Sequence, residues 1–479
     1  MSTGQNIRKD LPEGTSPPEP TQNVVAVDLL NQLRKRKYDF KCKHHKDKAY
    51  KAGAYNYSTP IPGRTRKLID FRNRIYVAPL TTVGNLPFRR IMKGFGADIT
   101  CGEMAVSSCL LEGKSSEWAL VKRHPCEDVF GIQLAAGHAD HFTRVSELIE
   151  NEGIHVDFVD INMCCPLDLI CQKGAGAKMM QRENRLREVL IGMTNTLTIP
   201  VTVKMRTGWD EKKPFAHTLV RKIQSWGIPG IAAFMVHGRS RLQRYSKAAD
   251  WDYISMTAQN QSDEHDRIPV IGNGDVFSYT DWEEKKAREG VEATAMLGRG
   301  ALIKPWLPTE LKEKRHWDIS ATERLDILKE FVRFGLEHWG SDQKGVNNTR
   351  RFLLEWMSFL YRYVPVGMLE VVPQQLNQRP PSNLVSQYAM SLSDQTEIMS
   401  IVVDYGAVTV GFCCDPGTIQ SSTADIVVRH LLACVGSSSD SIRVICFLLF
   451  PHRSASHFSL QRRTPSPSIL DHDSVDEVT

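Results

Sequence analysis

Two adjacent cysteines end an apolar segment of the sequence, and thiols in that position could do chemistry. The segment reads VDFVDINMCCP, in which Cys164 and Cys165 stand directly before a proline. An ordinary structural strand ends at a polar turn, whereas this one ends at two thiols. Because a cysteine is also often buried as a small apolar residue, the role of these thiols depends on the elements around them.

Short apolar strands alternate with amphipathic helices from about residue 66 to about residue 312. Nearly continuous apolar strands in such a pattern predict a parallel sheet that is buried on both faces. Eight strand–helix units in about 240 residues predict an α/β fold, the (β/α)8 TIM barrel. An open doubly wound sheet is the alternative, but its usual Gly-x-Gly-x-x-Gly pattern does not follow the first strand. The eight predicted strands are RIYVAPL, ADITCGEM, VFGIQLA, VDFVDINMC, VTVKMRTG, GIAAFMVHG, PVIGNGD and ATAMLGRG.

Polar or reactive residues stand at the carboxyl end of nearly every predicted strand. Barrel enzymes build their sites at this end, so these residues should gather around one rim. The last two strands end in IGNGD and LGRG, and loops at these two positions commonly bind phosphate through backbone N–H groups. We therefore expect a cofactor that carries a phosphate. The strand ends are Pro79-Leu80-Thr81, Glu103-Met104, Gln133, Asn162 with Cys165, Lys204 with Arg206, His237 with Arg239, Asn273-Gly274-Asp275, and Gly298-Arg299.

Three further parts flank this predicted catalytic domain of residues 66–312. Residues 1–65 are basic and polar, and we expect a partly disordered arm with a short helix at 29–37. Residues 313–383 have helical periodicity, and Ser320 with Glu323 resembles a capping box, which predicts a smaller all-α domain. Residues 384–479 mix short apolar runs with Ser-rich stretches, and we expect a disordered tail.

The composition is that of an ordinary globular protein. Of 479 residues, 41% are hydrophobic and 24% are charged, and the net charge of +5 is too small to establish a nucleic-acid partner by itself. Eleven cysteines form no disulfide-like framework, which favours the cytosol or nucleus. We expect a monomer without a signal peptide, a membrane span or a metal site, since one cysteine beside His44 and His45 cannot make a zinc site.

Several motifs, taken in order along the chain, resemble those of the flavin-dependent tRNA-dihydrouridine synthases. They are APLTTVGNLPFRR, GIQLAA, DINMCCP, VKMRTG, MVHGRSRLQRY, IGNGD and RGALIKPW. The segments EWALVKRHPCEDVFGIQL, LKEKRHWDIS and TRRFLLEWMSFLYRYVPVG resemble the eukaryotic members that reduce a uridine of the variable loop. The resemblance extends from about residue 29 to about residue 382.

This resemblance implies FMN on the barrel rim, with NADPH or NADH as the reductant. It places the flavin ring against Pro79, Leu80 and Thr81. The polar edge of the ring would be bound by Gln133 and Lys204, with His237 close by. The residues that would hold the phosphate are Asn273, Gly274, Asp275, Gly298 and Arg299. A cation such as Lys204 would stabilise the negative charge of reduced flavin.

The resemblance also implies that Cys165 is the general acid. The signature of the family is Asn-x-Gly-Cys-Pro, and this chain reads Asn162-Met163-Cys164-Cys165-Pro166, so Cys164 replaces the glycine. A hydride delivered to C6 of the uracil would leave carbanion character at C5, which Cys165 would protonate. A thiol with a pKa near 8.5 is mostly protonated at neutral pH, as a proton donor must be.

The implied substrate is a uridine of tRNA, with mRNA as a second RNA target. Enzymes that act on a base in folded RNA usually extrude it, and they need a basic surface for the phosphates. Two alternatives stay open, namely an FMN barrel that reduces a small molecule such as dihydroorotate or an enone, and a catalytically impaired RNA-binding protein. The candidate RNA-binding residues are Asn162, Arg206, Arg239, Arg241, Arg244, Arg350 and Arg351.

Overall fold

The computed structural model describes residues 21–41, 67–243, 245, 247–261, 267–376 and 378. The expected disordered tail at 384–479 lies outside these residues, as do most of the N-terminal arm and Arg244. Within the described part of the chain, no helix combines the length and the apolar composition that a membrane span requires. No cluster of three or more His, Cys, Asp or Glu residues in the same part could hold a metal ion.

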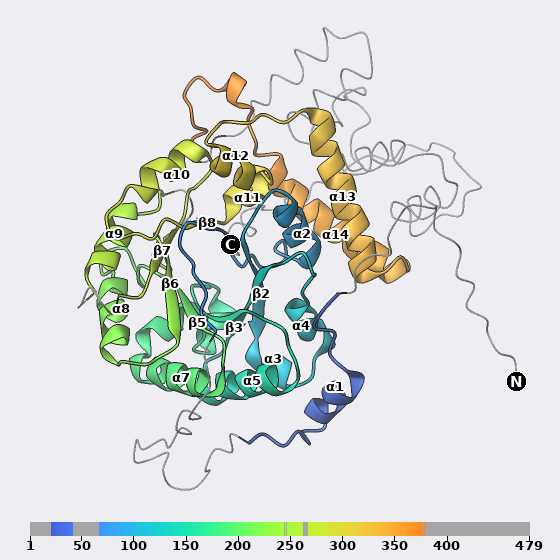
Figure 1. Cartoon of the computed structure of the whole chain (residues 1–479), viewed down its shortest axis with the longest axis vertical. Helices are drawn as coiled ribbons and strands as arrows, with labels where there is room; N and C mark the ends of the chain where they lie inside the picture. The colour runs from blue at the N-terminus through green and yellow to red at the C-terminus, as the bar shows by residue number, and fades with distance from the viewer. Residues whose placement is uncertain are drawn as a thin grey trace, which may run out of the picture.

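Eight parallel strands close into a barrel, so the predicted (β/α)8 fold is confirmed and the open sheet was the wrong alternative (Figure 1). Each strand pairs with the next one along the chain. Tyr76 of the first strand pairs with both Ile99 and Met296, which closes the ring. The strands are β1 (Ile75–Val77), β2 (Ile99–Val106), β3 (Val129–Ala135), β4 (Phe158–Met163), β5 (Val201–Arg206), β6 (Ile231–His237), β7 (Val270–Asn273) and β8 (Ala295–Leu297).

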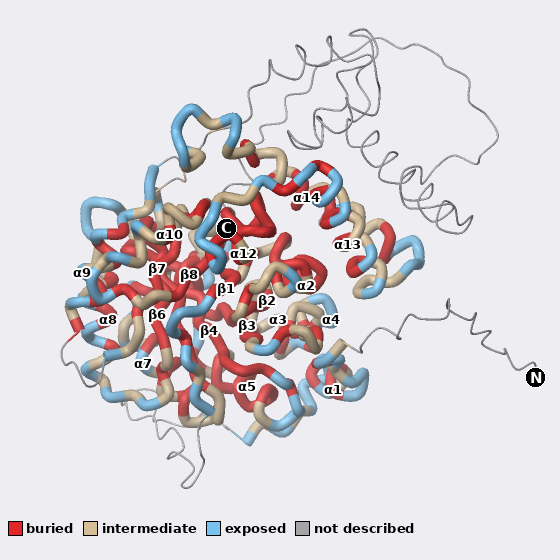
Figure 2. Tube along the Cα trace, turned by 45° about the horizontal axis from the view of Figure 1, so that its top comes forward, coloured by how far each residue is buried: buried red, intermediate tan, exposed pale blue. Residues whose placement is uncertain are grey.

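Helices surround the barrel because their apolar residues recur every three or four positions and face the strands. In α5 (Ala139–Asn151), for example, Phe142, Val145 and Leu148 are fully buried. Figure 2 shows the buried residues following the strands and the exposed ones following the outer loops. The other helices of this layer are α2 (Leu86–Gly94), α3 (Ser107–Leu111), α4 (Ser115–Trp118), α6 (Asp168–Gln172), α7 (Glu183–Thr196), α8 (Ala216–Ser225), α9 (Trp251–Gln259), α10 (Tyr279–Lys286), α11 (Arg299–Ile303) and α12 (Leu307–Glu313), with the short 3-10 helices η2 (Ala119–Val121) and η3 (Gly176–Gln181).

A buried ion pair fixes the start of α2 against the barrel. Nε of Arg89 donates to Oε1 of Glu127 at 2.7 Å, and both side chains are almost inaccessible to solvent. The same guanidinium donates to the carbonyl of Gly84 at 3.3 Å and to that of Lys122 at 2.8 Å. The carboxylate also accepts the hydroxyl of Thr100 at 2.6 Å. This network therefore holds the loop that follows β1, where Pro79 and Leu80 lie.

Two long helices, α13 (Ala321–Trp339) and α14 (Gln343–Leu360), follow the barrel and pack against α2 and α11, ahead of the 3-10 helix η4 (Val366–Met368). The predicted capping box is confirmed, since Ser320 and Glu323 exchange side-chain and backbone hydrogen bonds. Trp356 attaches α14 to the barrel, because its indole donates to the carbonyl of Leu302 at 3.1 Å and its ring packs on Phe88. The packing of α13 and α14 on the barrel accounts for the helical periodicity of their apolar residues. The tRNA-binding role expected for this region stays a prediction.

The described part of the N-terminal arm is docked on the barrel. Its helix α1 spans Val27–Arg34, so it begins two residues before the predicted 29–37 and ends three residues earlier. Leu29, Leu30 and Leu33 are buried against the barrel. Nε of Arg34 also donates to the carbonyl of Gly113 at 3.0 Å.

Candidate active site

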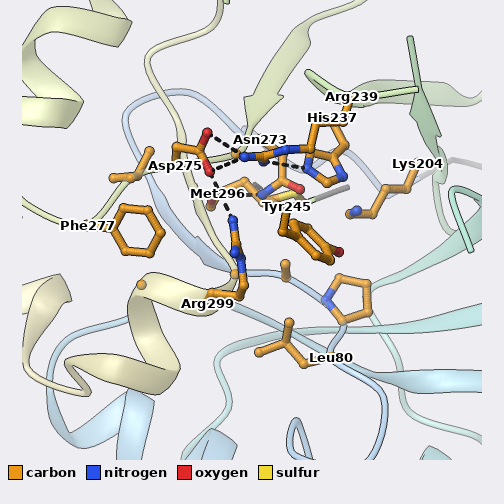
Figure 3. A pocket seen from close by; sticks show the side chains of 16 residues that line it. Leu80, Lys204, His237, Arg239, Tyr245, Asn273, Asp275, Phe277, Met296 and Arg299 are labelled. Carbon is orange, nitrogen blue, oxygen red and sulfur yellow. Dashed lines mark hydrogen bonds and ion pairs between the residues drawn. The ribbon is translucent and has the colours of Figure 1, made fainter. Parts of the chain in front are cut away.

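A pocket opens at the carboxyl ends of the strands, where the polar strand ends were predicted to gather (Figure 3). The last residues of β5, β6 and β7 and the loops after β1, β7 and β8 supply most of its wall. Thr81 and Gln133, which were predicted to contact the same cofactor, are not among the lining residues. The lining residues are Ala78, Pro79, Leu80, Lys204, His237, Arg239, Tyr245, Asn273, Gly274, Asp275, Val276, Phe277, Met296, Gly298, Arg299 and Gly300.

One carboxylate in the pocket is shared by two arginines. Nη2 of Arg239 lies 2.8 Å from each oxygen of Asp275, and Nη2 of Arg299 lies 3.1 Å from Oδ1 (Figure 3). Lys204 adds a further cation to the same wall. Three cations therefore face one anion, and the excess positive charge suits an anionic group such as a phosphate.

Two aromatic rings of this pocket were not singled out from the sequence. Tyr245 stacks on His237 with ring centres 6.0 Å apart, and the guanidinium carbon of Arg299 lies 4.1 Å from the centre of the tyrosine ring. Phe277 lines the opposite side of the same arginine at 5.7 Å. Their positions in the sequence could have indicated both rings, because Tyr245 ends the motif HGRSRLQRY and Phe277 stands two residues after Asp275. Both rings supply flat apolar surface beside the charged groups.

His237 is held in the neutral state. Burial lowers its pKa well below the usual value, and the nearby cations Arg206, Lys204, Arg239 and Arg299 lower it further. Nη1 of Arg239 lies 3.3 Å from Nε2 of the imidazole. Since a guanidinium can only donate, Nε2 must accept, and the ring proton is on Nδ1.

A chain of buried hydrogen bonds positions the loop that carries the two thiols. Oδ1 of Asn162 accepts the backbone N–H groups of Cys164 at 3.1 Å and Cys165 at 2.9 Å. The amide of Asn162 in turn donates to Gln133 at 2.7 Å, and Gln133 donates to Asp160 at 2.7 Å. Burial raises the pKa of Asp160 to about 6. Asn162 was predicted to bind RNA, but both ends of its amide are engaged within the protein.

Cys165 carries a protonated thiol at neutral pH. Burial raises its pKa to about 11, although the backbone N–H of Leu167 opposes part of this shift. The loop around it is compact because Gly176, at φ +56°, lies against it, and a Cβ there would come within 2.6 Å of the Cys165 carbonyl oxygen. Close packing on the cysteine loop thus explains why a glycine stands at position 176.

Cys164 connects this loop with the pocket. Its thiol is buried and lies 3.3 Å from Nζ of Lys204, which lines the pocket. Nε of Arg206 donates to the Cys164 carbonyl at 2.7 Å, while its Nη1 donates to the carbonyl of Ser240 at 2.9 Å. The side chain at this position, where the resembling family has glycine, therefore occupies one of the hydrogen bonds of Lys204.

The structure corrects part of the predicted RNA surface. Arg239 is fully buried and Arg206 is 2% exposed, so neither can meet an RNA phosphate at the surface. Both arginines can be buried because their guanidinium groups donate to acceptors inside the protein. Arg239 donates to the carboxylate of Asp275, and Arg206 donates to main-chain carbonyls. Arg241 does reach the surface, as do Arg350 and Arg351 of α14, and Arg351 also pairs with Glu355 at 3.0 Å.

Comparison with known proteins identifies the family. The family model described as dihydrouridine synthase (Dus) matches residues 76–358. A protein of Xenopus tropicalis named tRNA-dihydrouridine(47) synthase [NAD(P)(+)]-like is 54% identical over 327 residues, which cover 68% of this chain and 50% of that protein. Its namesake in Homo sapiens is 53% identical, with 68% and 49% covered, and a protein of Cryptococcus neoformans named tRNA-dihydrouridine(47) synthase is 49% identical over 333 residues, with 67% and 45% covered.

The family match covers the barrel and both long helices. The chain spans about half the length of the curated relatives that it matches. The matched range, residues 76–358, contains all the motifs between Pro79 and Trp306 that carried the resemblance. This chain belongs to the dihydrouridine synthase (Dus) family.

Proposed function

We propose that this protein reduces uridine to 5,6-dihydrouridine in tRNA, at variable-loop position 47, with FMN as its cofactor and NAD(P)H as the reductant. The observation that carries the proposal is the connection between the cationic pocket and the thiol loop. Lys204 lines the pocket and lies 3.3 Å from the thiol of Cys164, one residue before Cys165. The substrate position and the NAD(P) dependence are those in the names of the relatives.

The pocket fits FMN on two grounds. Arg239, Arg299 and Lys204 outweigh the single carboxylate of Asp275, which suits the charge of a phosphate. The loop after β8 leaves room for such a group, because, apart from Gly298 and its two chain neighbours, no atom of the described residues lies within 4 Å of a Cβ built on Gly298. When bound, FMN would supply the redox chemistry between NAD(P)H and the uracil.

The residues of the chain then have separate tasks. Cys165 holds a proton on its thiol for C5 of the uracil, since its raised pKa keeps it in the acid form. Asn162 fixes the backbone at Cys165, because its Oδ1 accepts the N–H groups of Cys164 and Cys165. Neutral His237 avoids adding another positive charge beside Lys204 and Arg299. Leu80 and Tyr245 enclose the pocket with apolar surface.

The proposal is tested with purified full-length protein and an unmodified tRNA transcript. We expect the protein to be yellow, to release FMN on denaturation, and to form one dihydrouridine at position 47 when NADPH is added, as read by nuclease digestion and mass spectrometry. A transcript with cytidine at position 47 is the matched control. The proposal fails if the protein cannot be reconstituted with FMN. A flavoprotein that consumes a small enone or dihydroorotate while leaving tRNA unchanged would establish the small-molecule alternative instead.

Gly298→Ala should weaken FMN binding while leaving the protein folded. The added methyl group meets open space in the protein but enters the region proposed for the phosphate. Displacing one hydrogen bond to a charged group, worth about 1.5–3 kcal/mol, should raise the FMN dissociation constant by roughly tenfold or more. The measurement is titration of apoprotein by flavin fluorescence, with the urea midpoint recorded beside it.

Two other glycines provide the controls. A Cβ on exposed Gly94 also meets nothing within 4 Å, but it lies outside the pocket, so Gly94→Ala should leave the FMN affinity unchanged and, at the end of α2, should not lower the urea midpoint. A Cβ on Gly300 would come within 2.1 Å of the Val276 carbonyl oxygen, so Gly300→Ala should lower the urea midpoint itself. Unchanged FMN affinity in Gly298→Ala would remove this loop from the cofactor site.

A further inference from the structure

A tryptophan on the barrel rim is covered by two cations that come from different loops. Trp209 lies in the loop after β5 and is half-buried. The guanidinium carbon of Arg241, after β6, lies 4.7 Å from the centre of its ring, and Nζ of Lys178, in η3 after β4, lies 5.1 Å from it. Loops after three consecutive strands therefore converge on one indole. The pocket does not include any of the three side chains.

This cluster is fixed to the cysteine loop. Nε of Arg241 donates to the carbonyl of Pro166, the residue after Cys165, at 3.1 Å, and its Nη2 pairs with the carboxylate of Asp168. The backbone N–H of Arg241 also donates to the carbonyl of Gly208 at 2.9 Å. The guanidinium that packs on the indole is thus bonded to the residue after the proposed proton donor.

The surface around the indole is apolar as well as cationic. Leu242, whose N–H donates to the Trp209 carbonyl at 3.2 Å, is 54% exposed, and Leu169, the residue after Asp168 in α6, is 68% exposed. The carboxylate of Asp168 is 80% exposed and already pairs with Arg241. A carboxylate in this position works against a phosphate but does not hinder a flat, uncharged ring.

These features together suit a nucleic-acid base. Single-stranded and extruded bases are bound by stacking on aromatic side chains or on the plane of an arginine guanidinium. Extruding one nucleotide breaks its stacking with the neighbouring base, so an enzyme gains by offering that neighbour a substitute surface. A rigid stack of indole and guanidinium beside the site of proton transfer is such a surface.

We propose that Trp209, with Arg241 and Lys178, forms a stacking platform for an RNA base adjacent to the uridine that enters the pocket. The inference rests on the proposed function, because it takes the extruded uridine as given. The platform contacts the flat face of a base, so its contribution to the RNA-binding affinity does not depend on the phosphates. It therefore adds affinity that salt does not screen.

The test compares Trp209→Ala, Trp209→Phe and the control Trp226→Ala in the full-length protein. Trp226 is also half-buried but lies between α8 and β6, at the opposite end of the barrel. A stacked base is worth about 1–3 kcal/mol, so Trp209→Ala should weaken binding of unmodified tRNA by roughly 5- to 150-fold. Trp209→Phe should retain most of the affinity, and Trp226→Ala should match the wild type.

Three further readouts decide between stacking and other roles. The FMN content and the rate of flavin reduction by NADPH should be unchanged in Trp209→Ala, and the slope of tRNA affinity against salt concentration should equal that of the wild type. If the salt slope of Trp209→Ala were smaller than that of the wild type by the amount that one phosphate contact contributes, the proposal would be overturned, since the cluster would then bind phosphate. So would tRNA affinity within twofold of the wild type, or a wild-type dimer in sedimentation that Trp209→Ala converts to a monomer, which would make the surface a contact between copies of this chain.

The stacking platform and the proposed enzymatic activity are tested by different outcomes. If the wild type forms dihydrouridine and Trp209→Ala binds tRNA equally well, the platform is wrong and the proposed function stands. If the wild type neither binds nor modifies tRNA, the proposed function is wrong, whatever Trp209 does.

Discussion

Replacing Cys165 with alanine should slow dihydrouridine formation about 10²–10⁴-fold while leaving the flavin reducible by NADPH. That range is the usual contribution of a positioned general acid. The thiol suits this task because burial raises its pKa to about 11, so it stays protonated through neutral and mildly alkaline pH. Single-turnover mixing of pre-reduced protein with tRNA, followed by dihydrouridine analysis, measures the step itself.

Cys164 provides the matched control for this prediction. Its thiol lies one residue away and contacts Lys204 at 3.3 Å, so Cys164→Ala should have a much smaller effect on the proton transfer. Cys164→Gly restores the residue of the family signature, releases one hydrogen bond of Lys204, and should preserve or raise the rate. A large loss in either Cys164 variant, with normal turnover in Cys165→Ala, would assign the proton to the other thiol.

The pH dependence gives an independent check on the same residue. A thiol donates its proton only below its pKa, so the rate should lose this contribution as the pH rises through about 11 and not before. Between pH 7 and pH 9 the wild-type rate should therefore show no decline from this group. An alkaline decline with an apparent pKa near 8.5, absent from Cys165→Ala, would show that the thiol ionises as if it were exposed.

Arg89→Met should destabilise the barrel by about 3–5 kcal/mol, because removing one partner of a buried ion pair leaves the other charge uncompensated. Glu127 is completely buried, and Arg89 is its charged partner at 2.7 Å. The substitution also removes the donors that hold the carbonyls of Gly84 and Lys122. Urea unfolding followed by circular dichroism measures the change. Weaker FMN retention should accompany it, since the loop after β1 lines the pocket.

An exposed pair supplies the contrast. Arg288 pairs with Asp252 and Glu284 at the surface, with its side chain 37% exposed, and Arg288→Met should cost no more than about 1 kcal/mol. Replacing both Arg89 and Glu127 with methionine should cost less than Arg89→Met alone, because no unpaired charge is then buried. If Arg89→Met proved as mild as Arg288→Met, the carboxylate would have to be neutralised by some other group.

The eight strands were predictable because burial on both faces requires nearly continuous apolar runs, and such runs are local features of the sequence. The polar residues that end them could likewise be placed on one rim, since the carboxyl ends of parallel strands in a closed barrel all point the same way. The capping box at Ser320 was predictable for the same reason, because its partner lies three residues away. The sequence by itself thus determined the barrel, the rim and the candidate thiol loop.

Only the tertiary structure decided which rim residues face the pocket and which are held inside. Arg239 and Asp275 are 36 positions apart, and Lys204 and Cys164 are 40 apart, so their pairing depends on how neighbouring strands are placed in space. A basic residue just past a strand end can turn outward to solvent or inward to an acceptor, and the local sequence is the same in both cases. Arg239 turned inward because the carboxylate of Asp275 is there to compensate its burial, whereas Arg241 remained at the rim, packed on Trp209.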